Sequence, residues 1–121
     1  MNPQELLDVL TDLFPRFRGQ WDDLENNMHR NDDEFTPHGV CAEFSSYFFE
    51  HCTSATDETL VRLFAVIERE VASDLQDSDA VANALCTCFL ENIAQTQAGN
   101  RCVPFMGPAS RDFFEHWHGA R

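Results

Sequence analysis

The most concentrated charged chemistry in this sequence lies between positions 22 and 34. Six of the thirteen residues there are Asp or Glu, and Arg30 is the only arginine or lysine among them. Such a surface complements arginine and lysine side chains on a partner and speeds the encounter with it. We therefore expect this region to bind a protein, with two neighbouring aromatic residues as apolar anchors. The expected partner-binding residues are Asp22, Asp23, Glu25, Asp32, Asp33, Glu34, Trp21 and Phe35.

The alternative interpretation of these carboxylates is a solvated helix end followed by a polar loop. They do not predict a calcium site, because the run from Asp32 to Glu34 lacks the alternating oxygen ligands and the turn glycine of an EF-hand loop. Protein binding and simple solvation are therefore the two interpretations that the sequence leaves open for this segment.

The cysteine and histidine residues do not have the spacing of a structural metal site. Cys86 and Cys88 lie two residues apart on an expected helix, as do His116 and His118 near the end of the chain. Residues two apart on a helix diverge by about 200°, so Cys86 and Cys88 are poorly placed to hold one ion. Structural zinc sites use longer spacings on turns. We expect no metal and no cofactor.

Two carboxylates are flanked by apolar residues, Glu68 in AVIERE and Glu91 in CFLENI. A carboxylate near a core must be paired or hydrogen-bonded. We therefore expect each to cap a neighbouring helix or to pair with Arg62 or Arg69. A pair of carboxylates can also perform acid–base chemistry, as in glycoside hydrolysis, but placement at a helix edge explains these two equally well.

The sequence contains no motif of nucleophilic catalysis or phosphate binding. It has no G-x-S-x-G, no P-loop and no glycine-rich dinucleotide turn, and only five glycines in all. A reactive cysteine needs an electropositive environment, which so acidic a chain does not favour. We expect no enzymatic activity.

Helical periodicity runs through nearly the whole chain and determines how these residues are positioned. Apolar residues recur at helical intervals, and no segment shows the sustained alternation of a strand. Asn2-Pro3 and Thr36-Pro37 are start signals, each a cap followed by proline. The expected helices cover approximately residues 3–14, 17–30, 37–52, 57–71, 78–99 and 110–118.

These elements predict an all-α fold of five or six helices. A chain of 121 residues fits one domain, and we expect a single helical domain over residues 1–121. Its helices are expected to form either an orthogonal bundle or a HEAT-like stack of helical hairpins.

The overall charge restricts the class of partner. The chain carries 21 acidic and 8 basic residues, a formal net charge of -13. Such a field repels nucleic acid and anionic membranes and attracts basic proteins or cations. We expect a protein partner, and neither nucleic acid nor a membrane. The alternative is that the acidity serves only to keep the protein soluble.

The cysteines and the N-terminal sequence favour a cytoplasmic location. The five cysteines are an odd number, and the sequence MNPQELLDVL resembles an amphipathic helix rather than a secretory signal. No apolar run approaches the roughly 20 residues needed to cross a bilayer. We expect free thiols in a reducing compartment.

Four segments resemble successive parts of a group of small, acidic, all-helical bacterial proteins. They are LTDLFPRF, EFSSYFFE, LVRLFAVIEREVAS and VANALCTCFLENIA, within residues 7–95. The group's pattern is an early LFP, a helix of the form lf..iE and a helix of the form v.n....fLE.l. Glu68, Asn83 and Glu91 match its recurrent polar positions, which implies that they support the fold. The acidic stretch around 22–34 and the tail with cysteine and proline depart from the pattern.

The resemblance implies a function, because many proteins of this group are thought to be immunity proteins that neutralise toxins delivered between competing bacteria. On that basis we expect a cytoplasmic immunity protein that binds a cognate toxin domain and occludes its active site. The alternative is a non-enzymatic helical adaptor or regulatory domain, including a homodimeric one.

Overall fold

The computed structural model describes residues 2–28, 36–72 and 80–116, without the side chains of 24–28 and 80. Across these ranges the chain is helical and contains no strand, so the predicted all-α class is confirmed. The α-helices are α1 (Pro3–Leu13), α2 (Pro15–Met28), α3 (Pro37–His51), α4 (Asp57–Ala72), α5 (Ala80–Leu85), α6 (Glu91–Ile93), α7 (Gln97–Cys102) and α8 (Pro108–Glu115). Short 3-10 turns cover Cys52–Ser54 and Val103–Phe105, and a π-helical turn at Cys86–Leu90 joins α5 to α6.

The predicted start signals of α1 and α3 are confirmed. The Asn2 side chain accepts the Glu5 N–H at 2.8 Å, and the Asn2 N–H donates to the Glu5 carboxylate at 2.9 Å, which forms a capping box. Thr36 accepts the Gly39 N–H at 3.0 Å. For α4 the capping side chain is Thr56, which accepts the Thr59 N–H at 3.1 Å.

The described ranges hold seven helices rather than five or six, because the continuous run Ala80–Ile93 is one helix and α7 is separate from it. The sequence predicts a single helix to about Gly99. Instead, Gln95 adopts a φ of 62°, which breaks the helix. Thr96 then caps α7 by accepting the Gly99 N–H at 3.2 Å. The last helix also begins earlier than expected, at Pro108.

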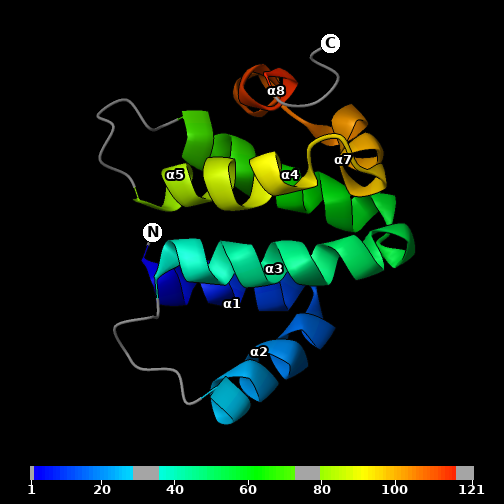
Figure 1. Cartoon of the computed structure of the whole chain (residues 1–121). Coiled ribbons are helices and arrows are strands. Elements are labelled where there is room, and N and C mark those ends of the chain that lie inside the picture. Colours follow the sequence, from blue (N-terminus) through cyan, green and yellow to red (C-terminus); the bar gives the residue numbers. More distant parts are fainter. Residues whose placement is uncertain (1, 29–35, 73–79, 117–121) are drawn as a thin grey trace.

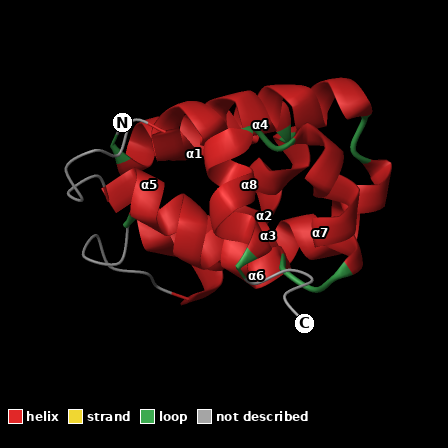
Figure 2. Ribbon diagram, turned by 90° about the horizontal axis from the view of Figure 1, so that it is seen from above, coloured by secondary structure: helices red, strands yellow, loops and turns green. Residues whose placement is uncertain are grey.

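Four helices surround a common core. Helix α1 contacts α3 and α4, and the helix from Ala80 to Ile93 also contacts α3 and α4. In Figure 1, α1 and α3 run in one direction and α4 returns in the other. Because α1 also contacts α4, the four helices form a closed bundle rather than a linear stack of hairpins. Figure 2 shows the same bundle from above.

The remaining helices cover this bundle. Helix α2 turns away after Phe14, whose backbone leaves the helical region at φ -130° and ψ 80°, and it packs against α1 and α3. Helix α8 packs against α4 and the π-helical turn. Within the described ranges, every helix is too short or too polar to cross a bilayer.

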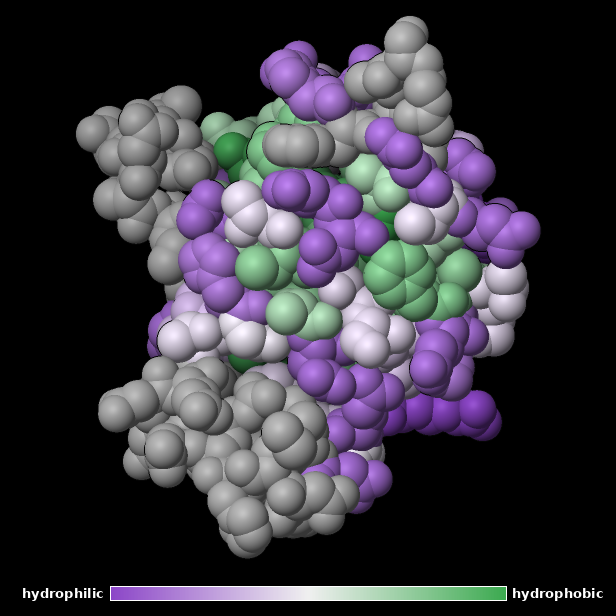
Figure 3. Space-filling view, viewed as in Figure 1, coloured by the Kyte–Doolittle hydropathy of each residue, from purple (hydrophilic) through white to green (hydrophobic). Residues whose placement is uncertain are grey.

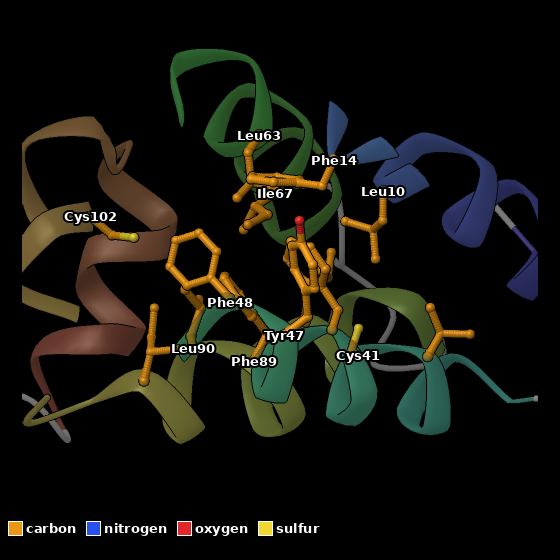
Figure 4. Packing of buried hydrophobic residues seen from close by; sticks show 14 of the residues in the cluster. Leu10, Phe14, Cys41, Tyr47, Phe48, Leu63, Ile67, Phe89, Leu90 and Cys102 are labelled. Atoms are coloured by element: carbon orange, nitrogen blue, oxygen red, sulfur yellow. The ribbon is translucent and has the colours of Figure 1, made fainter. Parts of the chain in front are cut away.

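Aromatic rings form the centre of the core. Phe44 lies 5.2 Å from Phe14, 5.2 Å from Phe17 and 5.3 Å from Phe89, measured between ring centroids. Figure 4 shows Phe48 and Phe89 among aliphatic side chains of α4 and the π-helical turn, Leu63, Ile67 and Leu90. Each fully buried ring contributes on the order of 1.5–3 kcal/mol, so these contacts hold α1, α2, α3 and the helix of Phe89 in fixed relative positions.

Candidate functional site

Helix α2 presents two adjacent exposed carboxylates, Asp22 and Asp23. Its other face carries Phe17 and Trp21, which are 0% and 1% exposed and whose ring centroids lie 6.3 Å apart. The spacing of these two rings, one turn of helix, fixes which face of α2 is buried. Asp22 and Asp23 make no ion pair with any residue that the structure describes. In Figure 3 the described surface over α2 is hydrophilic.

Of the expected partner-binding residues, the structure therefore places Asp22 and Asp23 at the surface and corrects the role of Trp21. An indole that is 1% exposed is a core residue and is not available as a surface anchor. The side chain of Glu25 and residues Asp32, Asp33, Glu34 and Phe35 lie outside the described residues.

Glu68 caps helix α8 from the side of α4, one of the two roles expected for it. Its carboxylate accepts the Ala109 N–H at 2.9 Å, the Ser110 N–H at 2.9 Å and the Ser110 hydroxyl at 2.8 Å. The residue before α8, Gly107, has no side chain with which to cap the helix. A Cβ on Gly107 would lie 2.5 Å from Glu68 Cδ, so the absence of a side chain lets the carboxylate approach.

The electrostatics of Glu68 are those of a structural cap. Burial raises its pKa, but the hydrogen bonds from Ser110 and Ala109 lower it more, so the pKa of Glu68 lies below its ordinary value. A general acid at neutral pH needs the opposite shift. This geometry gives the Glu68 carboxylate a structural role rather than an acid–base one.

The expected pairing of Glu68 and Glu91 with arginine is wrong for the arginines named. Arg62 pairs with Glu58 at 2.7 Å, and Arg69 contacts Glu70 at 3.4 Å. Glu91 begins α6 and is partly exposed. Sequence spacing alone does not show which of several nearby carboxylates an arginine reaches.

Asn83 links two helices of the bundle. Its side-chain nitrogen lies 3.0 Å from Nε2 of His38, which joins α5 to the first turn of α3. The resemblance implies that Asn83 supports the fold, and a contact between two helices is compatible with that role.

All five cysteines are free thiols in the structure, and Cys41, Cys52 and Cys102 are buried. Burial raises the pKa of Cys41 far above its usual value and that of Cys102 to about 12, so neither forms a thiolate readily. Among the described residues, no three His, Cys, Asp or Glu side chains are grouped so that they can hold a metal ion.

A cavity of about 400 Å³ opens where α1 meets α2, beside the end of α3 and the start of α4. Sequence reasoning did not find it, because its walls come from two stretches that lie far apart in the chain, residues 13–16 and 47–59. Residues 13–16 supply one side, and Tyr47 and His51 supply another. The lining residues are Leu13, Phe14, Pro15, Arg16, Tyr47, His51, Ser54, Ala55, Thr56 and Thr59.

Together, the helical bundle and its exposed carboxylates define a small, acidic, all-helical domain. The chain belongs to the family described as a domain of unknown function, DUF7674, whose model matches residues 7–118. That span includes α2, Glu68 and the cavity. No curated protein and no solved structure matches the chain.

Proposed function

We propose that this protein is a non-enzymatic binding protein that recognises a basic protein partner through the outer face of α2. The observation that carries the proposal is the pair Asp22 and Asp23, exposed side by side on a helix whose opposite face is fixed in the core by Trp21. A helix backbone that is fixed in place before binding loses little conformational entropy when a partner arrives.

Asp22 and Asp23 have no basic partner among the described residues, which also supports binding of a basic protein. Elsewhere on the described surface, Asp8 lies 3.7 Å from Arg18, and Asp57 lies 2.7 Å from Arg101. No cation among the described residues pairs with Asp22 or Asp23, so both are open to an arginine or lysine of another protein. With a net charge of -13, the whole chain steers a basic partner toward it.

In its specific form, the proposal is a cytoplasmic immunity protein that covers the active site of a cognate bacterial toxin. This form is supported by the resemblance of segments within residues 7–95 to small acidic immunity proteins. Asp32, Asp33 and Glu34 extend the acidic sequence beyond α2 and belong to the proposed interface on the basis of sequence alone.

The test uses the protein encoded beside this gene, with association rates measured by stopped flow at two salt concentrations. The double variant Asp22→Asn/Asp23→Asn should associate severalfold more slowly at low salt, with a weaker salt dependence. The matched control is Asp12→Asn/Glu115→Gln, which removes the same charge from exposed positions on α1 and α8 and should behave like the wild type.

Equal rates for the two double variants would exclude α2 from the interface. Failure of the neighbouring protein to bind at all, together with a dimeric mass by light scattering, would favour the homodimeric adaptor. Survival of cells that express the neighbouring protein only when this chain is present would support the immunity function directly.

A further inference from the structure

The cavity between α1–α2 and the start of α4 contains a buried polar atom with no described partner. Tyr47 is 6% exposed, and its hydroxyl makes no hydrogen bond with any residue that the structure describes. In Figure 4 the phenol oxygen points away from α3 toward Phe14, another residue of the cavity wall. This hydroxyl faces the cavity and has no described protein partner, so it is available to hydrogen-bond a bound molecule.

The cavity wall contains basic rather than acidic side chains, which is unusual for this chain. Arg16 and His51 line it, and no Asp or Glu does. Arg16 makes no ion pair or hydrogen bond with the described residues, whereas Arg18, two positions later, pairs with Asp8. The charge of Arg16 also acts on the phenol, because it lowers the pKa of Tyr47 against the larger raising effect of burial.

His51 completes this side of the cavity. Its ring lies 4.3 Å from the ring of Tyr47, one helical turn earlier on α3. The carboxylate of Glu50 reaches His51 Nε2 only at 3.9 Å and is 73% exposed. The two rings therefore form a continuous wall that leads from the buried hydroxyl to the surface.

The start of α4 provides the opposite wall, through Thr56 and Thr59. The two acidic residues in the first turn of α4 pair with arginines that do not line the cavity. Asp57 pairs with Arg101 at 2.7 Å, and Glu58 pairs with Arg62 at 2.7 Å.

From these observations we propose that the cavity binds a small organic anion, with a carboxylate or phosphate head against Arg16 and the Tyr47 hydroxyl. Leu13, Phe14 and Pro15 provide an apolar wall for the body of the molecule. A volume of about 400 Å³ is within the range of small-molecule sites. This site lies apart from Asp22 and Asp23 and does not depend on the proposed protein partner.

The test is an NMR titration of the whole protein at physiological salt with three probes: phenyl phosphate, benzoate and uncharged benzyl alcohol. At least one anion should give saturable shifts at the amides of Ser54 to Thr59, and should bind about tenfold more tightly than benzyl alcohol. The stronger of the two anions identifies the head group as phosphate or carboxylate.

Two variants assign the contacts. Arg16→Gln should weaken anion binding about tenfold, and Tyr47→Phe about fivefold. Arg69→Gln, which removes an exposed arginine of α4 outside the cavity, should leave binding unchanged. The proposal is overturned if neither anion saturates, if benzyl alcohol binds as tightly as both anions, or if Arg16→Gln behaves like Arg69→Gln.

Discussion

One carboxylate oxygen of Glu68 accepts both the backbone N–H and the hydroxyl of Ser110, at 2.9 and 2.8 Å. The contact joins residues 42 positions apart in the chain and attaches α8 to α4. A helix normally takes its cap from the residue that precedes it. Here Gly107 precedes the helix, and the cap comes from a different helix, so the local start of α8 depends on the tertiary structure.

Replacement of Glu68 should therefore destabilise the protein more than replacement of an exposed acid on the same helix. We expect Glu68→Gln to lower the free energy of unfolding by about 1–3 kcal/mol, because N–H and O–H donors of α8 lose a charged acceptor. Glu58→Gln, which breaks only the exposed pair with Arg62, should cost less than about 1 kcal/mol. Urea denaturation of both variants measures the difference; equal losses would contradict the capping role.

The same carboxylate should make stability depend on pH in a defined direction. The pKa of Glu68 is lower in the folded protein than its reference value of 4.5, so the folded state favours the ionised form. Its contribution is complete above the unfolded pKa and is lost as the pH falls through the lowered folded pKa. The stability difference between wild type and Glu68→Gln should be constant near neutrality and should narrow in acid. A difference that widens in acid would contradict the lowered pKa.

Much of this fold could be predicted from local sequence. Asn2 and Thr36 cap the helices expected of them because a cap and its helix are adjacent in the chain. The sequence does not indicate the break at Gln95, because the helical spacing of apolar residues continues up to Ile93, directly before the backbone turns. A positive φ at a residue other than glycine has no clear sequence signal.

The candidate sites were less predictable. The periodicity of α2 that exposes Asp22 and Asp23 also places Trp21 on the buried face with Phe17. The composition around Trp21 gives no such answer, because an aromatic residue beside acidic ones fits either a core or an interface. The cavity around Arg16 and Tyr47 is formed by residues 13–16 and 47–59. Only the packing of α1, α3 and α4 brings these two stretches together.

Removal of the Tyr47 hydroxyl and removal of the Ser110 hydroxyl should affect the free energy of unfolding differently. Tyr47→Phe should change the free energy of unfolding by less than about 0.5 kcal/mol, or raise it, because the phenol has no described hydrogen-bond partner. Ser110→Ala should lower it by about 1–2 kcal/mol, because that hydroxyl donates to Glu68. Thermal or urea unfolding distinguishes the two. A large loss in Tyr47→Phe would show that the hydroxyl is already satisfied within the protein.

Trp21 should behave as a core residue in solution. In a Trp117→Phe variant it is the only tryptophan, since the sequence contains two. Its emission should lie at short wavelength and resist quenching by iodide, because the indole is 1% exposed. Trp21→Ala should lower stability by about 3–5 kcal/mol. Emission typical of a solvated indole in the single-tryptophan variant would restore Trp21 as a candidate surface anchor.

Two glycines should respond oppositely to the same added methyl group. Gly99 lies in α7, where a Cβ would collide with the backbone oxygen of Ile93 and lie 2.9 Å from Cζ of Phe114. Gly99→Ala should therefore lower stability by about 1–3 kcal/mol, because both neighbours are held in the core. Gly19 is exposed within α2, and a Cβ there meets nothing within 4 Å.

Gly19→Ala should raise stability by about 0.5–1 kcal/mol, because alanine restricts the unfolded chain and favours the helix. Urea denaturation of the two variants in parallel provides the measurement, with each serving as the control for the other. If both substitutions stabilise the protein, the close approach of α7 to Ile93 and Phe114 is incorrect. If both destabilise it, α2 is not helical at Gly19, and the surface position of Asp22 and Asp23 loses its structural basis.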